Sequence, residues 1–168
     1  ELEALRRNLD AVDDLVTRCA RIKVDFVRRD ERETGERALL NFGHTIGHAL
    51  EAADGYQGLA HGEAVAIGMV AAAFLGVDLG ISTPTLPAEI SELLELFGLP
   101  LCTPLAPQAL LPFLSHDKKR RAGRSRWVIV RKAGDACLIE EPAAASVERA
   151  LAAIHAPPAT AATEAPAA

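Results

Sequence analysis

Asn41-Phe-Gly-His-Thr-Ile-Gly-His48 and His61-Gly-Glu-Ala-Val-Ala66 together form the most informative part of this sequence. Three of the five histidines in the chain lie within them. On a helix, His44 and His48 would project from the same face one turn apart. His61 follows a predicted turn and opens a second helix, so it can fold back toward the first pair. Imidazole is a favoured zinc ligand, and a catalytic zinc commonly takes three protein ligands and keeps one open position.

A pair of buried structural histidines is the simpler interpretation of this spacing, and the flanking residues weigh against it. If a helix begins near Gly35, its otherwise apolar surface carries a polar stripe made of Arg37, Asn41, His44 and His48. Solvated helix faces usually carry Glu and Lys, and buried polar groups need partners. Arginine is the side chain best suited to bidentate binding of carboxylate or phosphate. The stripe therefore indicates one wall of a site for a small, oxygen-rich anion, with a metal beside it.

Composition limits the classes of protein that need to be considered. The 168 residues suffice for one core of ordinary domain size, and the net charge of −5 argues against nucleic-acid binding. The apolar run 64–77 is too short to span a bilayer and predicts a buried helix. Three cysteines without metal-ligand spacing fit reduced thiols in a cytoplasmic protein. The chain opens on Glu1 and its one methionine is Met69, so we expect a fragment of a longer protein.

The periodicity of apolar residues predicts a mainly α fold with a small β-hairpin near the C-terminus. We expect helices over residues 2–22, 35–53, 61–79, 87–97, 107–115 and 144–154. Residues 23–34 are charged and predicted to be irregular. Two strands, 126–131 and 136–140, are joined by Lys132-Ala-Gly-Asp135. Residues 156–168 are rich in Ala and Pro and predict a disordered tail after a folded domain over residues 1–155.

Several motifs resemble those of the 3-dehydroquinate synthase family, and they follow one another in the same order and with similar spacing. They are the run from Lys23 to Glu51, Gly55-Tyr56, the run from His61 to Met69, and Asp117-Lys-Lys119. The resemblance extends from about residue 1 to about residue 154. It covers only the family's C-terminal helical domain, of the dehydroquinate synthase-like (glycerol-dehydrogenase-like) fold. The N-terminal domain, which holds a glycine-rich NAD site in that family, is not in this sequence.

The resemblance implies a lyase of the shikimate pathway of aromatic amino acid biosynthesis. Members convert 3-deoxy-D-arabino-heptulosonate 7-phosphate to 3-dehydroquinate and phosphate, using a bound NAD⁺ and a Zn²⁺ or Co²⁺ ion. The implied partners are the sugar-phosphate substrate, the chain's own N-terminal NAD-binding domain and a second copy in a homodimer. Neither nucleic acid nor a membrane is expected as a partner. By itself, this chain is expected to be inactive.

The resemblance also implies roles for individual residues. His44 and His61 match the two histidine ligands of the metal, and the third ligand is a glutamate expected upstream of Glu1. His48 matches a site histidine near the substrate phosphate. The polar residues around the substrate carboxylate and hydroxyls match Lys23, Arg37 and Asn41, which with His48 form the predicted catalytic set. The phosphate end is expected to receive a cation from Lys118 or Lys119.

Other interpretations stay open at this point. Arg37 could merely pair with Glu33, Glu63 could merely cap a helix, and Lys118 and Lys119 could form a solvated loop. The chain could belong to another sugar-phosphate cyclase, such as a 2-deoxy-scyllo-inosose synthase, or be a non-catalytic helical module. The segments 30–35 and 40–44 resemble dehydroquinate synthase more than its antibiotic-pathway relatives.

Overall fold

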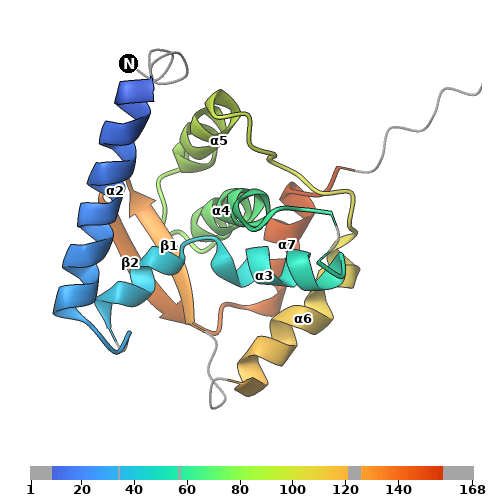
Figure 1. Ribbon diagram of the computed structural model, residues 1–168. Helices are drawn as coiled ribbons and strands as arrows, with labels where there is room; N and C mark the ends of the chain where they lie inside the picture. The colour runs from blue at the N-terminus through green and yellow to red at the C-terminus, as the bar shows by residue number, and fades with distance from the viewer. Residues whose placement is uncertain (1–8, 34, 57, 121–125, 157–168) are drawn as a thin grey trace, which may run out of the picture.

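The computed structural model describes residues 9–33, 35–56, 58–120 and 126–156 as a helical domain with one antiparallel hairpin (Figure 1). The elements in chain order are α2 (Leu9–Arg29), the 3₁₀ helix η1 (Glu36–Asn41), α3 (His44–Ala53), α4 (His61–Asp78), α5 (Leu86–Leu96), α6 (Pro107–Arg120), β1 (Arg126–Lys132), β2 (Asp135–Glu140) and α7 (Ala144–Ala153). The predicted mainly α fold with a small hairpin is confirmed. The predicted tail lies, apart from Ala156, outside the described residues.

Helix α4 is the centre of the core, and α3, α5, α7 and β1 all pack against it (Figure 1). It is apolar on every side, with Ile67 and Leu75 completely buried, as its composition predicts. By length and composition alone, α4 could cross a membrane, and it is the one such helix among the described residues. Because 61% of that span is buried inside the protein, α4 has the pattern of a core helix.

Glycines allow α3 and α4 to approach each other closely. A Cβ on Gly47 would lie 3.1 Å from the Cα of Val65, and one on Gly43 would lie 2.7 Å from the amide nitrogen of Met69. Gly43 also has a φ of 80°, which a residue with a side chain rarely adopts. These distances define a close approach of the two backbones. It brings the start of α3 against the first half of α4.

The hairpin follows the predicted strands closely. Trp127 pairs with Ile139 and Ile129 pairs with Cys137, and the turn between the strands contains Gly134 at a φ of 78°. Trp127 and Ile129 are buried, and β1 packs against α4. The hairpin therefore closes one side of the core and, through contacts of both strands with η1, reaches the histidine region.

Three predicted element boundaries are wrong. Helix α2 continues through the segment 23–29, because the half-buried Phe26 and Val27 extend its apolar face and two arginines in its last turn favour the helix dipole. The single helix expected from Gly35 to Ala53 is split into η1 and α3, because Gly43 takes a left-handed conformation against α4. Helix α6 continues to Arg120 instead of ending near residue 115, again with basic residues in its last turn.

Candidate metal centre and anion site

Three imidazole rings converge where α3 meets the start of α4. The ring centroids of His44 and His48 are 5.6 Å apart, those of His44 and His61 are 5.4 Å apart, and those of His48 and His61 are 5.8 Å apart. His44 is the first residue of α3, His48 lies one turn later, and His61 is the first residue of α4. The close glycine contact between the two helices thus brings together the three histidines singled out in the sequence.

Hydrogen bonds determine which ring nitrogen of two of these histidines can bind a metal. His44 Nδ1 lies 3.2 Å from the carbonyl oxygen of Phe42, which can only accept, so Nδ1 carries the proton. His61 Nδ1 lies 3.0 Å from Oε1 of Glu51, and an ionised carboxylate also only accepts. In both residues the lone pair is left on Nε2. An acceptor behind the ring is the usual arrangement for a histidine that ligates a metal.

The electrostatic environment of His44 favours its neutral form. Burial lowers the pKa of His44 below its ordinary value of 6.5, and the nearby His48 and His61 lower it further. The hydrogen bond to Phe42 and the charge of Glu51 act in the opposite direction, and the net direction is downward. Neutral imidazole is the form that binds metal ions. The donor set therefore fits a divalent ion of the zinc type.

Glu51 belongs to this cluster, although the sequence analysis gave it no role. His48, Glu51 and His61 each offer a possible ligand atom, and these atoms lie within 4.8 Å of one another. The signal was present in the spacing, because Glu51 follows His44 by seven residues and His48 by three, which places all three on one helix face. The structure thus adds a carboxylate to the three imidazoles.

A cavity of about 470 Å³ lies beside His44. The predicted site residues that line it are Lys23 from α2, Arg37 and Asn41 from η1, and His44 from α3. A smaller cavity of about 70 Å³ shares Asn41 and His44 and adds His48 and Arg126. The site residues are thus brought together although the continuous helical stripe is not formed. Two cations and an amide beside the histidines suit a small anionic ligand rich in oxygen.

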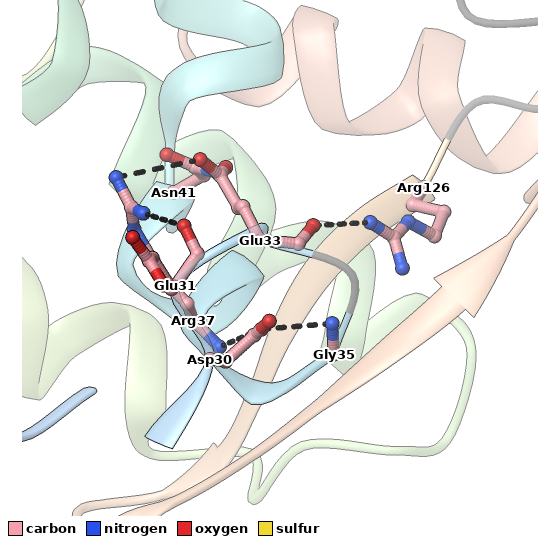
Figure 2. A network of polar contacts seen from close by, with 7 residues as sticks. All are labelled: Asp30, Glu31, Glu33, Gly35, Arg37, Asn41 and Arg126. Atoms are coloured by element: carbon pink, nitrogen blue, oxygen red, sulfur yellow. Dashed lines mark hydrogen bonds and ion pairs between the residues drawn. The ribbon is translucent and has the colours of Figure 1, made fainter. Parts of the chain in front are cut away.

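Glu33 organises the wall of the larger cavity (Figure 2). Its Oε1 accepts a hydrogen bond of 2.6 Å from Nδ2 of Asn41, and its Oε2 lies 3.9 Å from Nη2 of Arg37. Arg37 also donates from Nη1 to the carbonyl oxygen of Glu31, at 2.7 Å. The Arg37–Glu33 pair that the sequence offered as an alternative role therefore exists. It is long and solvent-accessible, so it does not account for the placement of Arg37 on the cavity.

The backbone that carries these side chains is held by Asp30 and Arg126 (Figure 2). Oδ2 of Asp30 accepts from the amides of Gly35 and Arg37, at 2.8 Å and 3.0 Å, and so caps η1. Nη2 of Arg126 donates to the carbonyl oxygen of Glu33, at 3.4 Å. Glu33 itself has a φ of 54°, which is uncommon for a residue with a side chain. From the sequence, Glu33 was expected only as a possible partner of Arg37, and Arg126 was given no role. Arg126 carries no local signal, because it is 93 residues away in the chain.

Lys118 and Lys119, the predicted phosphate contacts, belong to helix α6. The backbone of Lys118 and Lys119 is in the last turn of α6, so the predicted loop at this position is wrong, and their side chains lie outside the described residues. Helix α6, which carries them, packs against α3. Glu63 accepts a hydrogen bond of 2.8 Å from the amide of Ala60 and caps α4, which is the structural role that the sequence left open for it.

The fold and the site define a helical domain with a candidate metal centre beside a polar cavity, and comparison with known proteins gives its family. The family model described as 3-dehydroquinate synthase C-terminal matches residues 1–120. The 3-dehydroquinate synthase of Psychrobacter arcticus is 44% identical over 135 residues, which are 80% of this chain and 35% of that protein. That of Halorhodospira halophila is 46% identical over 137 residues, which are 81% of this chain and 39% of that protein.

Solved structures of related cyclases have the same fold. A 2-epi-5-epi-valiolone synthase from Streptomyces hygroscopicus, with NAD⁺ and Zn²⁺ bound, aligns with a TM-score of 0.77 at 25% identity, over 89% of this chain and 41% of that one. A 2-deoxy-scyllo-inosose synthase, complexed with carbaglucose-6-phosphate, NAD⁺ and Co²⁺, aligns with a TM-score of 0.61 at 25% identity, over 71% of this chain and 35% of that one.

This chain belongs to the 3-dehydroquinate synthase family and matches the family's C-terminal domain. The chain spans between 34% and 41% of the length of the curated relatives it matches. The family resemblance and the helical fold class expected from the sequence are thereby confirmed.

Proposed function

We propose that this chain is the metal- and substrate-binding part of a 3-dehydroquinate synthase. The complete enzyme would convert 3-deoxy-D-arabino-heptulosonate 7-phosphate to 3-dehydroquinate and phosphate in the shikimate pathway. The observation that carries this proposal is the convergence of Lys23, Arg37 and Asn41 on one cavity with His44, whose ring contacts the other two imidazoles. A substrate with a carboxylate, several hydroxyls and a phosphate matches these groups in charge and hydrogen-bonding type.

We assign His44 and His61 as metal ligands, through the Nε2 atoms that their hydrogen bonds leave free. The third ligand would be a glutamate from the upstream part of the protein. A Zn²⁺ or Co²⁺ ion held there would supply Lewis acidity at the substrate hydroxyl oxygens. The zinc and cobalt in the related cyclase structures support this choice of ions.

The other residues would bind and orient the substrate. Arg37 and Lys23 would receive the carboxylate, because they are the two cations that line the larger cavity. Asn41 would donate to a substrate hydroxyl, and Glu33 already holds its amide in place. His48 has an exposed ring at the edge of the cluster, so it can donate to the phosphate end. As phosphate leaves, His48 and one of Lys118 and Lys119 would stabilise its developing charge.

NAD⁺ would be bound by the upstream part of the enzyme. In the described residues the strands form one antiparallel hairpin, and no parallel strand–loop–helix unit of the dinucleotide-binding type is found. We therefore expect the upstream part to supply most of the NAD⁺ contacts. We also propose that the complete enzyme is a cytoplasmic homodimer.

Two alternatives remain distinct from this proposal. Another sugar-phosphate cyclase would share the fold and the metal, and the TM-score of 0.77 with the valiolone synthase is the observation in its favour. Identities of 40–46% with dehydroquinate synthases, against 25% with the two cyclase structures, favour dehydroquinate chemistry. A non-catalytic module would have no need for Lys23, Arg37, Asn41 and His44 to line one cavity, with two further imidazoles beside His44.

The experiment uses the full-length protein supplied with NAD⁺, Zn²⁺ and the heptulosonate phosphate. We expect dehydroquinate and phosphate to form in equal amounts, and Arg37→Met to lower kcat/KM by at least about tenfold through loss of carboxylate binding. Arg18→Met is the matched control, because Arg18 is exposed on α2 and pairs only weakly with Asp14. Turnover of a different sugar phosphate, without dehydroquinate, would identify the alternative cyclase. No turnover of either substrate would support the non-catalytic module.

A further inference from the structure

We infer that Glu51 is a positioning residue that fixes the tautomer and the ring orientation of His61 for the metal ion. This inference rests on the proposed function, since it concerns the proposed ligand His61. The observation is the hydrogen bond of 3.0 Å between His61 Nδ1 and Glu51 Oε1, which joins α4 to α3 across ten residues of chain.

The burial of the two side chains shows which one holds the other. The carboxylate side chain of Glu51 is 13% exposed, whereas the His61 side chain is 56% exposed. His61 is the first residue of α4, where a side chain without a partner would rotate freely. Glu51 lies in the last turn of α3, on the face that carries His44 and His48. The better-buried carboxylate therefore restrains the exposed ring.

The geometry favours this role over direct ligation of the same ion. The two nitrogens of an imidazole point to opposite sides of the ring, and a zinc–nitrogen bond is about 2.0–2.1 Å long. An ion on Nε2 of His61 therefore lies on the side away from the carboxylate that holds Nδ1. Glu51 could share an ion with His61 only if Nδ1 lost its proton and the hydrogen bond broke.

His44 has the same arrangement with a different acceptor. The carbonyl oxygen of Phe42 accepts from Nδ1 of His44, just as Glu51 accepts from Nδ1 of His61. Among the described hydrogen bonds of the three-histidine cluster, none holds the ring of His48 in this way. Both proposed ligands are thus oriented from behind by an acceptor.

The first test measures the tautomer of His61 without any metal. Nitrogen-15-labelled 168-residue chain is studied by long-range proton–nitrogen correlation about two pH units above the ordinary histidine pKa of about 6.5. We expect His61 to carry its proton on Nδ1 in the wild type and in Glu51→Gln, whose amide oxygen still accepts. Glu51→Ala should shift His61 toward the Nε2–H tautomer. An unchanged His61 tautomer in Glu51→Ala would overturn the inference.

The second test measures metal binding by the full-length protein. We expect Glu51→Ala to weaken Zn²⁺ binding about 10- to 100-fold, as for other residues that orient a ligand, and Glu51→Gln to weaken it by less than about tenfold. The electronic spectrum of bound Co²⁺ should keep its band positions in both variants. Equal, severe losses in both variants with a changed cobalt spectrum would make Glu51 a ligand and refute a positioning role.

His61→Ala separates this inference from the proposed function. If His61→Ala binds metal normally, the proposed metal site is wrong, and the tautomer measurement still decides whether Glu51 controls His61. If His61→Ala loses the metal and Glu51→Ala binds it with unchanged affinity, the metal site stands and the inference about Glu51 fails.

Discussion

A Cβ placed on Gly68 of α4 would overlap the carbonyl oxygen of Gly43 and lie 2.9 Å from the amide nitrogen of Gly47. The obstructing atoms are backbone atoms, which cannot rotate away as a flexible side chain can. This contact fixes the distance between α3 and α4 and hence the distance from His44 to His61. The candidate metal centre therefore depends on a glycine in the contact between the two helices.

We predict that Gly68→Ala destabilises the protein by about 1–3 kcal/mol, because the two helices must separate. The matched control is Gly62→Ala in the first turn of the same helix, where a Cβ would meet no atom within 4 Å. That change should be neutral or stabilising by up to about 1 kcal/mol, as alanine favours helix more than glycine does. Urea unfolding followed by circular dichroism measures both. Equal stabilities of the two variants would contradict the close-contact account.

The ion pair between Asp78 and Arg149 predicts a pH-dependent contribution to stability. Arg149 donates to both carboxylate oxygens, at 2.6 Å and 2.7 Å, and so ties α7 to the end of α4. These hydrogen bonds from Arg149, with a smaller effect of Ser146, lower the pKa of Asp78 to about 2. Since the folded-state pKa lies below the unfolded value of about 3.9, the stabilisation is present above that value and is lost as pH falls through about 2.

We therefore expect Asp78→Asn to lower the urea midpoint at neutral pH, and the difference from wild type to shrink between about pH 4 and pH 2. Asp14→Asn is the control, because the Asp14–Arg18 pair lies on an exposed face of α2 and should contribute little. A midpoint difference for Asp78→Asn that stays constant over this pH range would show that the carboxylate charge is not responsible.

The sequence predicts those parts of the fold that depend on local pattern. The hairpin follows from two strands separated by a turn with Gly134, and α4 follows from a long apolar run. The break at Gly43 could not be predicted, because its left-handed backbone is set by contact with α4. The extension of α2 to Arg29 was missed because the charged residues of this segment predicted an irregular chain. The half-buried Phe26, which continues the apolar face of the helix, was not taken into account.

The same division applies to the site. Helical spacing alone brought His44 and His48 together, and it also places Glu51 on their face. Glu33 reaches Asn41 through a turn with an uncommon positive φ, which no periodic pattern indicates. Arg126 reaches the turn of Glu33 from a strand 93 residues later. Glu51 could therefore have been found from chain spacing, whereas the contacts of Glu33 and Arg126 are set by the turn and by tertiary packing.

The 168-residue chain should be catalytically inactive by itself. It spans 35% and 39% of the length of the two 3-dehydroquinate synthases compared above, and the strands of the described residues form a hairpin and not a dinucleotide-binding unit. An active site between two domains would then be only half formed. We expect no dehydroquinate from the purified chain with NAD⁺, metal and substrate, and recovery of turnover in the full-length protein. Turnover by the isolated chain would refute the two-domain account.

The basic end of α6 should contribute one phosphate contact. We expect Lys118→Met or Lys119→Met in the full-length enzyme to cost about 2–4 kcal/mol of transition-state binding, which is a loss of about 30- to 1000-fold in kcat/KM. Methionine keeps the length of the side chain and removes its charge. Arg120→Met and Arg121→Met serve as controls and should change kcat/KM by less than about tenfold. Near-normal kcat/KM in both lysine variants would place the phosphate site elsewhere.

The central claim is that His44 and His61 bind one divalent metal ion. The most direct measurement is the metal content of the full-length His44→Ala, His61→Ala and His48→Ala proteins after dialysis, by inductively coupled plasma mass spectrometry. His48 is the matched control, because its ring lies within 6 Å of both others but is proposed to contact substrate. The account predicts one Zn²⁺ per chain in the wild type and His48→Ala, and loss of the ion with loss of turnover in the other two variants. Full zinc content and turnover in both His44→Ala and His61→Ala would contradict it.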